Sequence, residues 1–259
     1  MTDVTLPPLE SPRRLMFDWV SDVFFHPRQA FARIATQTSG VWLTPILILT
    51  LTALLSVAVA GPIKKDAAQS GQGALPPEFQ YYTPEQQAQF QQAQASTSGP
   101  VFVYVFPAIA ALGKVWIGWR LVGGLVHLVL TLIGGRGDTR AAMNIVAWAG
   151  LPLALRDLVR VAAMLSTHRL ISSPGLSGFA PAGAGNLSLF LVSFLTLVDL
   201  YVLWHIVLLV LGVRAGSSLP RAKAVGGVLF AMLLVLSLQV LVGFGVAKLG
   251  GLTIIRPFF

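Results

Sequence analysis

Charged side chains inside long apolar runs are the residues of this sequence best suited to chemistry. An ionisable residue within a membrane span is costly, so it is a functional candidate by default. Counting about 1.5 Å per residue places Arg120, Arg156 and Asp199 in the middle-to-outer part of a bilayer core about 30 Å thick. We therefore expect these three residues to form an intramembrane polar cluster. The other candidate members are Asp157, Arg160 and His205.

This polar cluster has three interpretations. In the first, Asp199 neutralises one arginine while the other basic side chains extend to lipid headgroups. In the second, the excess positive charge holds an anionic group such as a lipid phosphate. In the third, Asp199 and His205 form a proton or ion path, although their spacing puts them on different faces of a helix. Asp157 and Arg160 are three residues apart and can pair locally.

No catalytic residues, cofactor site or metal site are expected. The sequence has no cysteine, which excludes thiolate catalysis and Cys-ligated metals. Its four histidines lack the spacing of metal ligands. A phosphate-binding glycine loop with Lys-Ser/Thr and a Gly-x-Ser-x-Gly elbow are both missing from the sequence. Asp199 stands alone in its apolar run, so the paired carboxylates of a membrane-embedded hydrolase are missing too.

Composition indicates an all-α integral membrane protein. The 259 residues are 55% hydrophobic and 11% charged, with a mean hydropathy of +0.75, whereas soluble domains are about 25% charged. The net charge of +8 comes from basic residues that mostly flank apolar runs, so nucleic-acid binding is not expected. About forty residues precede the first run, which therefore indicates an uncleaved helix rather than a signal peptide.

Five transmembrane helices are predicted in a single helical bundle. The expected spans are about 41–61, 112–133, 141–164, 187–211 and 224–247. Residues 101–111 would form a kinked extension of the second span. The expected membrane domain is 41–249, preceded by a disordered tail (1–11) and followed by a tail outside the membrane (250–259).

The segment 62–100 is predicted to be an extramembrane loop. Nine glutamines lie between Gln69 and Gln94. Within this loop, Thr83-Pro84-Glu85 is a typical helix start, which predicts a helix at about 84–95.

The distribution of Lys and Arg predicts the orientation. With the N-terminus in the cytoplasm, nine basic residues lie on the cytoplasmic side and five on the outer side. This arrangement follows the positive-inside rule and puts the C-terminus and the Gln-rich loop outside. Arg outnumbers Lys by thirteen to five, which favours a bacterial source and hence the bacterial inner membrane.

Residues 12–40 are predicted to form cytoplasmic amphipathic helices. Apolar residues recur at helical spacing on both sides of a break at His26-Pro27. Two interpretations stay open: the helices pack on the cytoplasmic face of the bundle, or they bind a partner. The candidate interface residues are Trp19, Phe24, Phe25, Pro27 and Phe31.

Several motifs in order carry a family resemblance. They are Phe24-Phe25-His26-Pro27-Arg28-x-Ala30-Phe31-x-x-Ile34, Val41-Trp42-x-x-Pro45, a glycine-rich turn after the second run, Ala147-Trp148-Ala149-Gly150-Leu151-Pro152, Trp204, Leu211-Gly212-Val213-Arg214 and Ala222-Lys223-Ala224. Over about 20–249 the chain resembles the Yip (Ypt-interacting protein) family in its bacterial form. This resemblance implies five spans and a cytoplasmic N-terminus.

The resemblance does not extend to a GTPase partner. Eukaryotic members of the family bind Rab-type GTPases and carry an Asp-Leu-Tyr-Gly-Pro motif. Here Asp199-Leu200-Tyr201 is followed by Val202 and lies in the fourth span, not the first. The resemblance therefore implies the fold and membrane residence, and leaves the partner open.

The leading functional interpretation is a non-enzymatic membrane protein that organises membrane or recruits a partner through its N-terminal helices. The alternative is a small permease or lipid-handling protein that uses Arg120, Arg156 and Asp199. Transporters often show repeats and broken helices; the sequence shows no clear repeat, and only Pro107 and Pro152 are candidate breaks. Candidate partners are the lipid bilayer, a protein at the N-terminal helices, an anionic lipid and further copies of the chain in a homo-oligomer.

Overall fold

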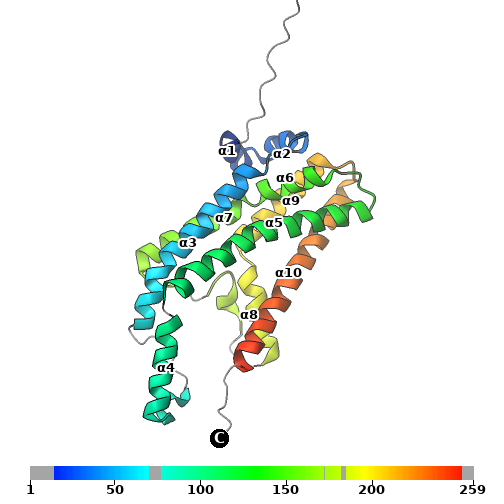
Figure 1. Ribbon diagram of the computed structural model, residues 1–259. Coiled ribbons are helices and arrows are strands. Elements are labelled where there is room, and N and C mark those ends of the chain that lie inside the picture. Colours follow the sequence, from blue (N-terminus) through cyan, green and yellow to red (C-terminus); the bar gives the residue numbers. More distant parts are fainter. Residues whose placement is uncertain (1–14, 70–76, 98, 172, 182–184, 253–259) are drawn as a thin grey trace, which may run out of the picture.

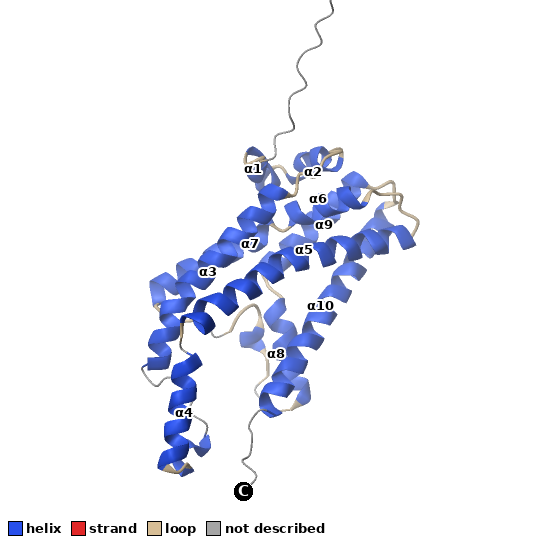
Figure 2. Ribbon diagram, in the orientation of Figure 1, coloured by secondary structure: helices blue, strands red, loops and turns tan. Residues whose placement is uncertain are grey.

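The fold is described from a computed structural model, which describes residues 15–69, 77–97, 99–171, 173–181 and 185–252. Every element in these ranges is a helix (Figure 1; Figure 2). They are α1 (Asp18–Phe25), α2 (Pro27–Ala35), α3 (Leu43–Gln69), η1 (Pro77–Tyr81), α4 (Pro84–Thr97), η2 (Val101–Val105), α5 (Phe106–Leu132), α6 (Thr139–Ala149), α7 (Leu151–Thr167), η3 (Ser177–Phe179), α8 (Asn186–Leu197), α9 (Leu200–Gly216) and α10 (Arg221–Leu252). The tail predicted at 1–11 lies outside the described residues, as do residues 253–259 of the tail predicted at 250–259. Residues 250–252 belong to the end of α10 instead of to a tail.

Three helices are long and apolar enough to cross a membrane, as expected for a membrane protein. They are Leu43–Asp66, Val101–Leu132 and Arg221–Gly245. The pair α8 and α9 meets the same criteria together, but is bent by 60° at its break. The described part of the chain therefore contains three candidate spans, or four if the bent pair is one span.

Two predicted spans are broken, unlike the single helices that the sequence suggested. The run 141–164 forms α6 and α7, which meet at Gly150. Pro152 stands in the first turn of α7, where its missing N–H is tolerated. The run 187–211 is divided between Leu197 and Leu200, because Asp199 adopts an extended conformation and caps α9. A side-chain cap there allows a new helix to start within an apolar run.

The second span begins earlier than predicted. The π-helical turn η2 leads directly into α5, and Val101–Leu132 forms one candidate span of 32 residues. Pro107 lies in the first turn of α5 and does not interrupt it. The helix predicted at about 84–95 is confirmed as α4.

The N-terminal helices lie across one end of the bundle (Figure 1). α4 and α8 lie toward the opposite end. Helix α2 packs on α6 and α9, and its Phe31 is fully buried. Gly212 of α9 allows this close approach, since a β-carbon there would come within 2.8 Å of the Phe31 ring.

The linker from α2 to α3 is fixed by buried side chains of α6. The Val41 N–H donates to Asn144 Oδ1 at 3.0 Å, and the amide of Asn144 donates to the Ser39 carbonyl at 3.0 Å. The Trp148 indole donates to the Val41 carbonyl at 2.9 Å. Because buried polar groups need such partners, these bonds specify where the N-terminal helices join the bundle.

Candidate functional site

Four of the predicted polar residues lie together where α7 faces the start of α9. Arg156 Nη1 is 3.4 Å from Asp199 Oδ2, and Arg160 Nη2 is 3.9 Å from the same oxygen. Arg156 Nε is 3.7 Å from Asp157 Oδ1. The side chains of Arg156 and Asp199 are each only 12% exposed. We call Arg156, Asp157, Arg160 and Asp199 the polar cluster. It joins α7 to the start of α9, and its Arg156 and Asp199 are 43 positions apart in sequence.

The helix break positions Asp199. Its backbone is extended, and its Oδ1 accepts the Val202 N–H at 2.8 Å, which satisfies a free donor at the start of α9. Its Oδ2 remains directed to the arginines. One carboxylate therefore caps a helix and pairs with two guanidinium groups.

The loop between α7 and α8 contributes hydrogen bonds at the break. The Leu176 N–H donates to the carbonyls of Leu195 and Val198 at 2.9 and 3.0 Å. The preceding Gly175 has a φ of +63°, and a β-carbon there would lie within 2.8 Å of three carbonyl oxygens. Only glycine permits this approach, and the loop thereby satisfies carbonyls that the end of α8 leaves free.

Lys114 of α5 adds a cation that the sequence interpretation did not assign to the polar cluster. It interacts electrostatically with Arg156, Asp157, Arg160 and Asp199. Three cations then face two carboxylates, which leaves one positive charge in excess. The Arg156 Nε is buried and has no hydrogen-bond partner among the described residues.

Arg120 and His205 lie outside the polar cluster. The exposed Arg120 stacks on the ring of Trp119, with 5.6 Å from its guanidinium carbon to the ring centroid. His205 is buried, and its Nδ1 lies 2.8 Å from the Ala149 carbonyl. This contact holds α9 against the junction of α6 and α7. The structure brings together four of the six polar candidates, and the ion pair that Arg160 forms within 4 Å is with Asp199.

The five candidate interface residues divide into two groups. Phe31 is buried, Trp19 packs on Trp148 with ring centroids 5.8 Å apart, and Phe24 packs edge-on against Trp204 at 5.4 Å. These three contact the bundle.

The other two interface candidates, Pro27 and Phe25, are at least partly accessible to a partner. Pro27 opens α2 and is half-buried, while Phe25 is 78% exposed. Phe17, which the sequence interpretation did not select, is 59% exposed beside α1.

Comparison with known proteins decides the family. A family model described as the Yip1 domain matches residues 21–243. The chain belongs to the Yip1 domain family. No curated protein and no solved structure matches it. The resemblance inferred from the sequence motifs is confirmed over most of the chain.

The matched region of this Yip1-domain protein includes most of the N-terminal helices and the polar cluster. It begins within α1, contains the whole polar cluster and ends within α10. The N-terminal helices are therefore part of the Yip1 domain rather than an appendage. Their buried aromatic contacts with the bundle agree with this.

The chemistry available to the Yip1-domain protein at this cluster is electrostatic. Guanidinium groups paired with carboxylates can hold helices together or attract an anion. Among the described residues, no group of three or more His, Asp or Glu is placed to hold a metal ion. The break in α8–α9 is stabilised by a cap and by loop hydrogen bonds. These contacts favour a structural role for the cluster.

Proposed function

We propose that this Yip1-domain protein is a non-enzymatic membrane protein that recruits a protein partner through its N-terminal helices. The observation that carries the proposal is the division of aromatic residues in α1 and α2. Trp19, Phe24 and Phe31 dock these helices on the bundle, while Phe17 and Phe25 face outward. A docked pair of helices with free aromatic side chains is well suited to binding, because aromatic residues, Phe included, are enriched in the cores of protein interfaces.

The proposed topology has five spans. In it, α6 and α7 together form the third span and α8 and α9 the fourth. The N-terminus is cytoplasmic and the C-terminus outside, in the inner membrane of a bacterium. The excess of basic residues on the side of α1 and α2 supports this orientation.

The polar cluster has a structural role in this proposal. Asp157 and Asp199 offset the two arginines of the cluster, and the neighbouring Lys114 leaves one positive charge in excess. The pairing ties α7 to α9 at the break. Broken spans also occur in transporters, but the pairing of Asp199 with Arg156 and Arg160 across the break favours a structural role over the permease alternative.

Photo-crosslinking at Phe25 tests partner recruitment. We expect a photoreactive phenylalanine analogue at position 25 to form a discrete protein adduct in native membranes, because this ring is 78% exposed on a docked helix. Tyr81 is the matched control, since it is 80% exposed in the Gln-rich loop. Adducts are read by the mass shift on a gel. Adducts with lipid alone at position 25, or equal protein adducts at both positions, would contradict recruitment.

A further inference from the structure

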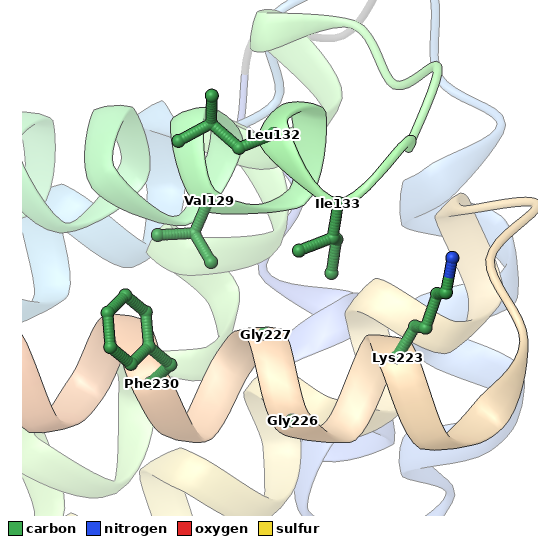
Figure 3. Close-up of a pocket in the computed structure, with 7 residues that line it drawn as sticks. All are labelled: Val129, Leu132, Ile133, Lys223, Gly226, Gly227 and Phe230. Atoms are coloured by element: carbon green, nitrogen blue, oxygen red, sulfur yellow. The ribbon is translucent and has the colours of Figure 1, made fainter.

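A groove runs between the end of α5 and the start of α10 (Figure 3). Its volume is about 520 Å³, within the range of about 300–1,000 Å³ that small-ligand sites occupy. Val129, Leu132 and Ile133 line it from α5. Lys223, Gly226, Gly227 and Phe230 line it from α10.

One side of this groove is open because of Gly226. A β-carbon at Gly226 would meet nothing within 4 Å, whereas one at Gly227 would press on Ile133 at 2.9 Å. Gly227 therefore sets the distance between the two helices, and Gly226 leaves space beside them. Leu132 and Phe230 remain exposed along the walls. The space is apolar except at one end, which Lys223 occupies (Figure 3).

The charge at that end is positive. Lys223 is exposed, and Arg221 lies two positions before it. Arg136 follows Ile133 by three positions in the turn after α5. The only acidic residue of this turn, Asp138, caps α6 by accepting the Arg140 N–H at 3.2 Å. An anion at Lys223 would therefore meet little competing negative charge.

The groove also lies where lipid headgroups would be. α5 and α10 are two of the candidate spans, and their ends meet here. The Gly135 backbone packs against Leu219 of the turn before α10, and Gly216 packs against Ala35 of α2. The groove thus opens at the end of the bundle that carries α1 and α2. The apolar part of this groove suits an acyl chain, and the cation at its end, near the membrane surface, suits the phosphate of the same lipid.

We propose that this groove binds one anionic phospholipid of the leaflet on the side of α1 and α2. An acyl chain lies against Leu132, Gly226 and Phe230, and the headgroup phosphate contacts Lys223. This site is separate from the polar cluster and from the exposed Phe25. It does not depend on partner recruitment.

Lipid titration of the purified, delipidated full-length protein tests this site. Native mass spectrometry measures the dissociation constant of the first bound lipid, with phosphatidylglycerol or phosphatidylcholine as the probe. Wild type is expected to prefer phosphatidylglycerol. Lys223→Gln should weaken phosphatidylglycerol binding about fivefold, the effect expected for one basic residue at an anionic headgroup. It should weaken phosphatidylcholine binding less, because the trimethylammonium group of that lipid offsets the charge of its phosphate, so the preference for phosphatidylglycerol falls.

A groove-filling variant distinguishes the site from ordinary lipid contact. Gly226→Leu should weaken binding of both lipids about tenfold. This is the effect expected if the new side chain displaces about two methylene groups of the acyl chain from the groove. Gly243→Leu is the matched control on the same helix, because a β-carbon there also meets nothing within 4 Å. It should bind as wild type does. Equal affinities for Gly226→Leu and Gly243→Leu, or an unchanged lipid preference in Lys223→Gln, would overturn the proposal.

Discussion

Replacement of Asp199 by alanine is expected to lower the free energy of unfolding by about 3–5 kcal/mol, the usual cost of removing one partner of a buried ion pair. Asp199 is 12% exposed and is the carboxylate nearest to both Arg156 and Arg160. Without it, only Asp157 faces these two cations. The change also removes the cap of α9, which costs about 1 kcal/mol. Unfolding in detergent, followed by circular dichroism, measures the loss.

Two further variants separate charge from capping. Asp199→Asn keeps a good capping side chain but removes the charge, so it should be more stable than Asp199→Ala by about 1 kcal/mol. Adding Arg156→Gln to Asp199→Asn should recover part of the loss, because the uncompensated cation is removed. Arg120→Gln is the control, since Arg120 lies outside the polar cluster and stacks on the face of Trp119. Wild-type stability in Asp199→Ala would contradict the ion-pair account.

Phe31→Ala is expected to cost about 3–5 kcal/mol, as for a large aromatic residue deleted from a core. Phe31 is fully buried between α2, α6 and α9. Its loss should release α1 and α2 from the bundle and let them unfold locally. Trypsin should then cut faster after Arg28 and Arg33, which are exposed but held in a docked helix. The melting temperature and the rate of tryptic cleavage at these two sites are the measurements.

Phe25→Ala is the matched control for Phe31→Ala. The two phenylalanines belong to the same sequence motif, but Phe25 is 78% exposed. Its removal should change stability by no more than about 0.5 kcal/mol, as for surface positions in general. It should abolish partner binding instead. Equal loss of stability in both variants would mean that α1 is buried differently from the structure described here.

The sequence was sufficient to predict the apolar helical runs and the start of α4, but not the breaks within two of those runs. A long apolar run in a membrane protein is best explained as a helix in the bilayer. Thr83-Pro84-Glu85 marks the start of α4 directly. The break before α9 was missed because Asp199 was interpreted as a buried charge and not also as a helix cap. Its side chain serves both purposes. A cap residue inside an apolar run is a signal that could have revealed the break.

The members of the polar cluster were only partly predictable. Depth in the membrane brought Arg156 and Asp199 together correctly, since both estimates depend only on position along a helix. The rotation of each helix depends on its neighbours, which one sequence does not specify. Lys114 and Arg120 are six positions apart on α5, so their side chains point in different directions. Lys114 interacts with the charges of the polar cluster, whereas Arg120 stacks on Trp119.

The N-terminal segment shows the same limit. Periodicity identified α1 and α2 as amphipathic, and the break at His26-Pro27 is present. Periodicity could not tell which aromatic residues meet the bundle, because both sides of α1 carry large apolar side chains. Val23 is buried there, whereas Phe17 and Phe25 are exposed.

Cysteine labelling tests the central claim, a five-span Yip1 domain with α1 and α2 on the cytoplasmic side. The natural sequence has no cysteine, so each single substitution reports one site. The substitutions are Phe25→Cys, Tyr81→Cys, Phe179→Cys and Ser218→Cys, all at exposed positions.

A membrane-impermeant maleimide is applied to intact spheroplasts and to permeabilised ones. The five-span account predicts that cysteines at Tyr81 and Phe179 react in intact spheroplasts, and that those at Phe25 and Ser218 react only after permeabilisation. The Phe179 position is decisive because it follows α6 and α7 directly. If its cysteine reacts only after permeabilisation, α6 and α7 do not cross the membrane and the five-span account is wrong.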